Sequence, residues 1–209
     1  MGSATDFMPE RISLPALREA AAGCRGCDLY KDATQTVFGE GRKDARIVMV
    51  GEQPGDREDI EGRPFVGPAG GLLDRAIEEA GLVRDEIYFT NVVKHFKHVI
   101  RGKRRIHKKP DLEEIRACVP WLDAELARIR PEVLILLGAT AAQAILGRTF
   151  RVTQHRGEFV DSPLAPLVTA TVHPSSILRS GTDEERRSAF DSFVKDLRRV
   201  ERTMRAPTR

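Results

Sequence analysis

The sequence predicts an α/β fold, specifically a three-layer α/β/α sandwich with a central, mostly parallel sheet. Short apolar runs of strand length alternate along the chain with segments of helical periodicity. Several of the apolar runs end in a glycine-bearing or histidine-bearing turn, which is typical of buried parallel strands. No Pro/Gly/Ser-rich linker divides the 209 residues. We therefore expect a single domain over residues 1–209, with short flexible ends.

Four elements are predicted in the first half of the chain. Residues 14–22 have helical periodicity and lead directly into Cys24. Residues 45–50 form a short apolar run before a glycine turn, which indicates a buried strand. Residues 70–81 have the pattern of an amphipathic helix, and the β-branched and aromatic run 87–93 predicts the second strand.

The second half repeats the alternation of helix and strand. Asp111 is a candidate N-cap for a helix that runs to residue 128, with Pro120 as a possible kink. Gly138 and the residues after it open the next helix, which runs to residue 146. The remaining predicted elements are strands at 132–137, 152–160 and 167–172 and a final charged helix at 183–204.

Composition excludes several classes of protein. Hydrophobic residues make up 41% of the chain and charged residues 31%, as in globular proteins, and no apolar run is long enough to cross a bilayer. The N-terminal residues include acids and no long apolar core, unlike a secretory signal. We therefore expect a cytoplasmic protein that is not attached to a membrane.

Positive charge is concentrated in one segment of the chain. The net charge is only +3, yet residues 94–109 hold eight Lys or Arg and no acid. Such a run often forms nothing more than a solvated face. This run lies between predicted ordered elements, so its positive charges are held close together. A nucleic acid, DNA or RNA, would supply the negative charge that compensates them.

The three cysteines are Cys24, Cys27 and Cys118. An odd number of cysteines makes a disulfide framework unsuitable as an explanation. The C-x-x-C spacing of Cys24 and Cys27 allows two thiolates to bind one metal centre, with Cys118 as a third ligand. Since zinc and iron–sulfur sites usually have four ligands, a histidine is a natural fourth. A redox pair or a simple turn, with Cys118 buried in a helix, fits these residues equally well.

Polar residues follow three of the predicted strands. The turn 51–56, Asn91 and His173 each come at the carboxyl end of a strand, where open α/β sheets bind their ligands. Taken singly, a capping asparagine and a structural histidine are common. The turn lacks the glycine and lysine pattern of a phosphate-binding loop, which disfavours nucleotide hydrolysis.

Four motifs occur in order behind the C-x-x-C. They are Gly51-Glu-Gln-Pro-Gly-Asp56, Gly62-Arg-Pro-Phe-Val-Gly67, Tyr88-Phe-Thr-Asn-Val-Val-Lys94 and His173-Pro-Ser-Ser176. With them the chain resembles the uracil-DNA glycosylase superfamily, specifically its iron–sulfur branch. The resemblance runs from about Cys24 to the last helix.

Two departures refine the resemblance. His95 stands where the iron–sulfur branch typically has a cysteine, and residues 102–110 are an insertion. Together they resemble the UdgX-type glycosylases, which excise uracil and stay covalently bound to the DNA through a histidine of the inserted loop. By position that histidine is His107. The resemblance also implies a structural 4Fe–4S cluster on Cys24, Cys27, His95 and Cys118, with zinc as the alternative.

The resemblance assigns a role to each candidate residue. The catalytic candidates are Glu52, Asp56, His107 and His173. The uracil-binding candidates are Gln53, Phe65, Asn91 and His173. The DNA-binding candidates are Lys94, Lys103, Arg104, Arg105, Lys108, Lys109, Ser175 and Ser176. The alternative for Arg105 is to hold the loop through an acid such as Glu52.

The expected partner is uracil-containing DNA, in single-stranded form, and the expected state is a monomer. Neighbouring cations are expected to keep the His107 imidazole neutral and therefore nucleophilic. Two other functions are consistent with these residues: a conventional multiple-turnover uracil-DNA glycosylase, and a nucleic-acid-binding metalloprotein without catalysis.

Overall fold

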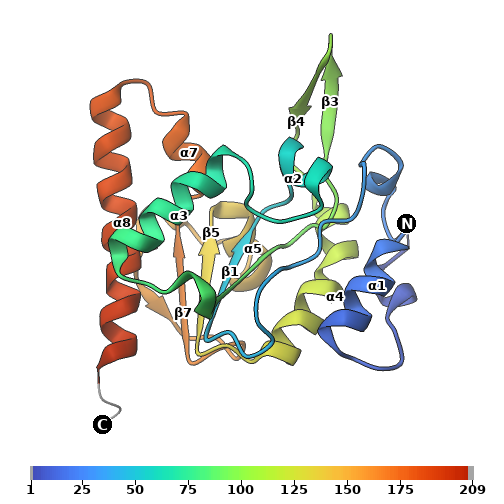
Figure 1. Cartoon of the computed structure of the whole chain (residues 1–209), viewed down its shortest axis with the longest axis horizontal. Helices are drawn as coiled ribbons and strands as arrows, with labels where there is room; N and C mark the ends of the chain where they lie inside the picture. The colour runs from blue at the N-terminus through green and yellow to red at the C-terminus, as the bar shows by residue number, and fades with distance from the viewer. Residues whose placement is uncertain (1, 207–209) are drawn as a thin grey trace.

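A five-stranded sheet forms the centre of the computed structural model, which describes residues 2–206 (Figure 1). The strand order is β2-β1-β5-β7-β6. The first four strands are parallel, and β6 pairs antiparallel with β7 at the edge. The strands are β1 (Ile47–Gly51), β2 (Ile87–Asn91), β5 (Val133–Leu137), β6 (Phe159–Val160) and β7 (Leu167–Thr171).

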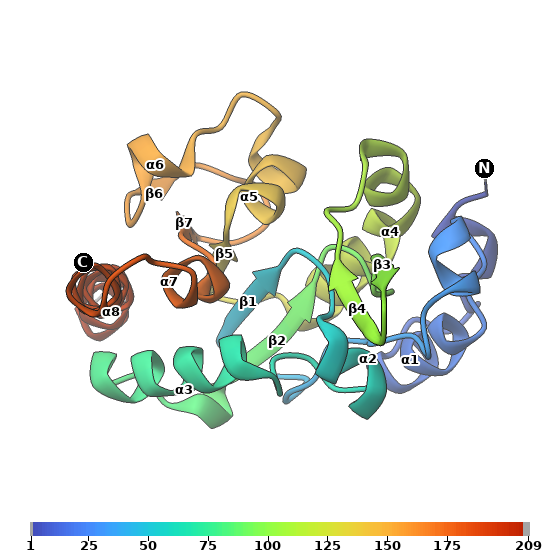
Figure 2. The same ribbon diagram turned by 90° about the horizontal axis from the view of Figure 1, so that it is seen from above.

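Helices cover both faces of the sheet, as the view from above shows (Figure 2). The alternation of side chains along β1 and β5 creates two cores: Val48 and Leu134 belong to the cluster packed with α1 and α4, and Ile47 and Val133 to the cluster packed with α3 and α8. The predicted sandwich is confirmed. The helices are α1 (Leu14–Ala22), α2 (Asp56–Glu61), α3 (Pro68–Ala80), α4 (Leu112–Ile129), α5 (Ala139–Leu146), α6 (Val152–His155), α7 (Pro174–Leu178) and α8 (Asp183–Arg205), with 3-10 turns at Ala4–Phe7, Asp28–Lys31 and Arg84–Glu86.

Most predicted elements lie within a few residues of the observed ones. Asp111 caps α4 by accepting a hydrogen bond from the Glu114 amide, and the helix continues across Pro120. No helix within residues 2–206 has the length and apolarity needed to span a bilayer.

The strand predicted at 152–160 is wrong for most of its length. Its first residues form α6, and only Phe159–Val160 pair with β7. Between them Gly157 has a left-handed φ of 70°, and its amide donates to the Ala170 carbonyl. This turn directs the chain back onto the sheet, so one continuous strand cannot form.

The basic insertion is an ordered β-hairpin. Strands β3 (His98–Arg101) and β4 (Arg104–His107) pair antiparallel, and Gly102 takes the left-handed φ of 60° at the tip. The hairpin projects above the body of the molecule, beyond the carboxyl ends of the central strands (Figure 1).

Candidate active site

A cavity of about 760 Å³ lies at the carboxyl ends of the central strands. Most of the sequence-predicted catalytic and uracil-binding residues line it. They are Glu52, Gln53, Phe65, Asn91, His107 and His173, joined by Lys109, Ser175 and Ser176 from the DNA-binding set. Of the residues predicted to be catalytic, only Asp56 does not line this cavity.

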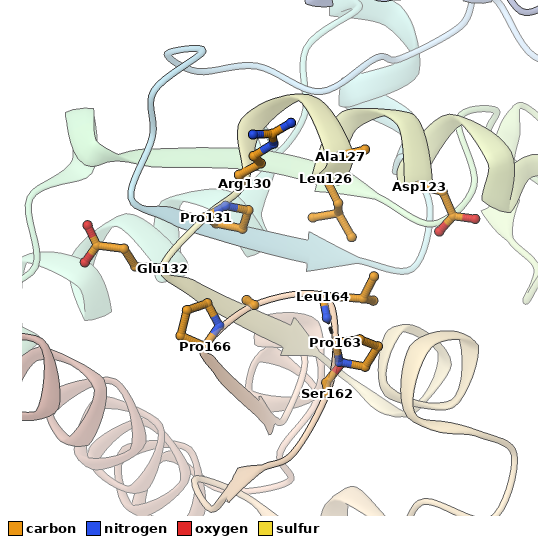
Figure 3. Close-up of a pocket in the computed structure, with 11 residues that line it drawn as sticks. Asp123, Leu126, Ala127, Arg130, Pro131, Glu132, Ser162, Pro163, Leu164 and Pro166 are labelled. Carbon is orange, nitrogen blue, oxygen red and sulfur yellow. Dashed lines mark hydrogen bonds between the residues drawn. The ribbon is translucent and has the colours of Figure 1, made fainter.

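A second cavity, of about 800 Å³, lies at the amino ends of the central strands (Figure 3). Glu132 and Pro166, which line it, stand just before β5 and β7. None of the sequence-predicted site residues lines this cavity.

Gly51, the last residue of β1, has no side chain, so Asn91 and Phe65 can pack directly against it. It pairs with Asn91 across the sheet, and a Cβ at Gly51 would lie 2.3 Å from Asn91 Oδ1 and 2.9 Å from Phe65 Cζ. Both side chains are buried. Phe65 has a φ of 56°, which is rare for an aromatic residue, and its ring lies roughly parallel to that of His173, 6.3 Å away.

Glu58 holds the two loops that flank the cavity, a role that the sequence prediction missed. Its carboxylate accepts hydrogen bonds from the Gly55 amide at 3.1 Å and the Gly67 amide at 2.9 Å. Gly55 belongs to the turn after β1, and Gly67 to the loop that carries Phe65. An available signal was the position of Glu58, the third residue of a helix, where a glutamate often caps the preceding amide.

Glu52 lies between His107 and Thr140. Its Oε1 is 3.3 Å from His107 Nε2, and its Oε2 accepts a hydrogen bond from the Thr140 hydroxyl. Burial alone would raise the pKa of Glu52. The bonds from His107 and Thr140 outweigh burial and lower that pKa below its usual value, so Glu52 is an anion at neutral pH.

His173 is neutral at physiological pH. Burial lowers its pKa to about 4. Its Nδ1 accepts a hydrogen bond from the Ser175 amide at 3.1 Å, which assigns the ring proton to Nε2. A neutral N–H donor therefore stands beside Phe65 in the cavity.

The hairpin is fixed to the body through Arg105 and Gln53. The Arg105 guanidinium binds Asp56 at 2.6 Å and Asp59 at 2.5 Å. The Gln53 amide group donates to the carbonyls of Lys97 and Lys108, at the two ends of the hairpin. These contacts place His107, the last residue of β4, at the cavity.

Comparison with known proteins shows the family of this chain. The family described as "Uracil DNA glycosylase superfamily" matches residues 38–198. The chain belongs to this superfamily. Similar proteins include a type-4 uracil-DNA glycosylase of Thermotoga maritima, 39% identical over 85% of this chain and 89% of its own, and one of Sulfurisphaera tokodaii, 37% identical over 79% and 76%. A third, from Archaeoglobus fulgidus, is 41% identical over 64% and 63%.

In this member of the uracil DNA glycosylase superfamily, four cations of the hairpin segment predicted to bind DNA are exposed: Lys103, Arg104, Lys108 and Lys109. Two other predicted contacts need correction. Arg105 is engaged by Asp56 and Asp59, so its guanidinium anchors the hairpin.

Lys94 is buried, and the prediction that it contacts DNA is wrong. Its side chain is 1% exposed, and Nζ lies 2.5 Å from Oε2 of the fully buried Glu125. Nζ also donates to the Thr90 hydroxyl and the Asn91 carbonyl. A buried lysine with an internal counter-ion cannot reach a phosphate.

The predicted metal ligands gather in the core between α1 and α4. Cys24, Cys27 and Cys118 are buried in the same cluster, and the Lys94 amide donates to Cys118 Sγ at 3.2 Å. Burial, and then the nearby Cys27 and Cys24, raise the pKa of Cys118 to about 12. Within residues 2–206, no three His, Cys, Asp or Glu side chains converge closely enough as placed to hold a metal ion.

His95 has the chemistry of a metal ligand. Burial lowers its pKa to about 4, which keeps it neutral. Its Nε2 lies 2.9 Å from the Thr36 hydroxyl, which itself donates to the Ala21 carbonyl. The Thr36 oxygen must then accept from Nε2–H, so Nδ1 is the ring nitrogen that bears the lone pair. Three thiols and this imidazole fit a cluster or zinc by donor type.

Proposed function

We propose that this chain excises uracil from DNA and that His107 then forms a persistent covalent bond to C1′ of the deoxyribose. The observation that carries the proposal is the docking of the hairpin, which holds His107 in the cavity within 3.3 Å of Glu52. Superfamily membership and the names of the type-4 relatives support the excision step.

Recognition of uracil rests on Phe65 and Asn91. A base must leave the stack before its glycosidic bond can be attacked, and a flipped base then needs a face to stack on and an edge to pair with. The Phe65 ring supplies the face. The Asn91 amide donates and accepts at once, which matches O4 and N3–H of uracil and is opposed by the pattern of cytosine. The backbone at Gln53 borders the same cavity and contributes further polar contacts.

Bond cleavage separates charge, and the cavity has a group for each sign. The Nε2–H of neutral His173 donates to uracil O2 as negative charge develops on the leaving base. The Glu52 carboxylate faces the electron-poor sugar. Asp56 does not line the cavity and is bound by Arg105, so we assign it to positioning the hairpin rather than to the chemistry.

His107 completes the reaction as a nucleophile. The ring nitrogen that bears the lone pair attacks C1′ as the C1′–N1 bond breaks, and uracil leaves with the bonding electrons. The imidazole becomes a cation, which the adjacent Glu52 carboxylate stabilises and whose N–H proton it can accept. An N-alkylated imidazole is a poor leaving group, so each molecule is expected to act once.

We also propose that Cys24, Cys27, His95 and Cys118 hold a 4Fe–4S cluster, with zinc as the alternative. The buried thiols and the tautomer of His95 support this assignment. When bound, the group would cross-link the N-terminal segment, the segment after β2 and α4. Iron and zinc content of the purified protein and its visible absorption test the proposal. H95A should lose the metal, whereas H98A should keep it.

A conventional glycosylase is the second candidate, because the same Glu52 carboxylate can orient a water molecule. Single-strand preference, monomeric state and cytoplasmic location stay predictions.

A denaturing gel separates the two candidates. The protein is incubated with a single-stranded oligonucleotide that contains one uracil, then heated in detergent. We expect a heat-stable shifted band with wild type and with H155A, a control histidine outside the cavity, and no band with H107A. Free uracil in excess over protein, without a shifted band, would support the conventional enzyme. An undiminished band from H107A would reject His107 as the nucleophile.

A further inference from the structure

The two faces of the β3–β4 hairpin make different contacts. Opposite residues of an antiparallel pair project to the same side, and successive residues alternate. The register pairs His98 with His107 and Ile100 with Arg105 on one face, the inner face. Val99, Arg101, Arg104 and Ile106 share the other, which we call the outer face.

Three of the four inner-face residues contact the body of the protein, and the fourth, Ile100 near the tip, is 74% exposed. Arg105 binds Asp56 and Asp59, and His107 lies beside Glu52. The His98 ring stacks on Phe96, with ring centres 4.9 Å apart. The orientation of the hairpin is therefore set by its inner side.

The outer face makes none of the ion pairs that fix the inner face, within residues 2–206. Val99 is 38% exposed and Ile106 39% exposed, and they stand opposite each other as a cross-strand apolar pair. Arg101 and Arg104 flank this pair at the tip, and no ion pair or side-chain hydrogen bond engages either guanidinium within residues 2–206. An exposed apolar pair lowers solubility unless a partner covers it. Because two arginines flank this pair, a polyanion is the favoured partner.

We propose that the outer face binds the DNA strand next to the flipped uridine, with Val99 and Ile106 against a flanking nucleobase and Arg101 and Arg104 on phosphates. The inference rests on the proposed function, because it places the uridine sugar at His107. Ile106 is adjacent to His107 in β4, but the two side chains project to opposite faces of the hairpin. A DNA strand that meets both would cross the edge of β4, and the apolar pair would then contact a base on one side of the flipped uridine.

Flipping the uridine gives this contact a physical purpose. Removing a base from the stack exposes the face of its neighbour to water, which costs free energy. An apolar pair can cover that face without reading its sequence, as side chains do in sequence-tolerant single-strand binding. The outer face would then lower the cost of flipping while His107 acts from the same strand.

A double-mutant cycle between protein and DNA tests the contact. The protein variant is V99T/I106T, which keeps β-branched side chains and strand propensity but removes apolar surface. The DNA carries 2′-fluoro-deoxyuridine, whose fluorine slows cleavage by destabilising the electron-poor sugar. In the altered DNAs an abasic residue replaces the base on one side or the other of the uridine. The control is V83T, because Val83 is exposed and lies just before β2, at the amino ends of the strands.

We expect wild type and V83T to lose about tenfold in affinity when one of the two flanking bases is removed, equivalent to about 1.4 kcal/mol. V99T/I106T should bind intact DNA about tenfold more weakly at the same salt and lose nothing further with that abasic DNA. Independent, additive losses, or equal affinity of V99T/I106T and wild type, would overturn the inference. Uracil release from ordinary uridine DNA by wild type is measured separately, so that failure of the proposed function is seen on its own.

Discussion

Replacing Lys94 by methionine should destabilise the fold without changing how salt affects DNA binding. Methionine keeps most of the side-chain volume but leaves Glu125 as a buried carboxylate without its cation. Lys94 Nζ and Glu125 Oε2 are 2.5 Å apart, at 1% and 0% exposure. Removing one partner of a buried pair costs about 3–5 kcal/mol, a large share of the roughly 5–15 kcal/mol that stabilises a typical protein.

Urea unfolding followed by fluorescence measures this loss, because the single tryptophan, Trp121, is fully buried on the same helix as Glu125. K94M should lower the free energy of unfolding by about 3–5 kcal/mol. K94M/E125Q should recover at least half of that, since no charge remains unpaired. K195M, on an exposed lysine of α8, should change it by less than about 0.5 kcal/mol.

The opposite result has a clear signature. If Lys94 contacts a phosphate instead, K94M unfolds like wild type, and the slope of log K against log salt for single-stranded DNA falls by about 0.7. That outcome would refute the assignment of Lys94 to the core.

Three further predictions follow from the geometry of the site. Replacing Arg105 by methionine leaves the fully buried Asp59 without its cation, so R105M should lower the yield of adduct on a denaturing gel at least tenfold; an unchanged yield would show that the hairpin docks without this anchor. A methyl group at Gly51 displaces both base-recognition side chains, so G51A should slow uracil release by roughly 100-fold, the cost of about 1 Å of misplacement, whereas G71A, whose Cβ meets open space, should act like wild type. The folded-state pKa of His173 is lowered to about 4, so the unfolded chain binds the proton first as the pH falls. The contribution of His173 to the free energy of unfolding should therefore be complete above about pH 6.5 and fall by at most ~3 kcal/mol towards pH 4. Urea unfolding of H173N should show a free energy of unfolding that depends less steeply on pH.

Alternation of apolar strands with amphipathic helices was enough to predict the sandwich and the edge of the sheet where the cavity forms. Carboxyl ends of parallel strands meet at one edge, so Glu52, Asn91 and His173 had to come together whatever the loops do. The exception, the segment 152–160, is a short run in which local turn geometry at Gly157 decides the structure. A turn of this kind barely changes the pattern of apolar residues in the sequence, so that pattern alone still predicts a strand.

The basic segment shows what charge alone does not reveal. Lys94 and Lys103 are alike in sequence context, yet the first is buried because Glu125, 31 residues later, lies opposite it in the fold. Strand alternation in β3 and β4 is masked, because apolar and basic residues share each face. The anchors of the hairpin, Asp56 and Asp59, are likewise distant in sequence from Arg105.

The most direct test of the central claim is the site of the covalent bond. After reaction with uracil-containing single-stranded DNA and nuclease treatment, trypsin cleaves after Arg105 and Lys108 and releases the peptide Ile106-His107-Lys108, which has a single histidine. We predict that mass spectrometry finds the deoxyribose phosphate on His107 in proportion to the uracil released. Full release of uracil with this peptide unmodified would contradict the account.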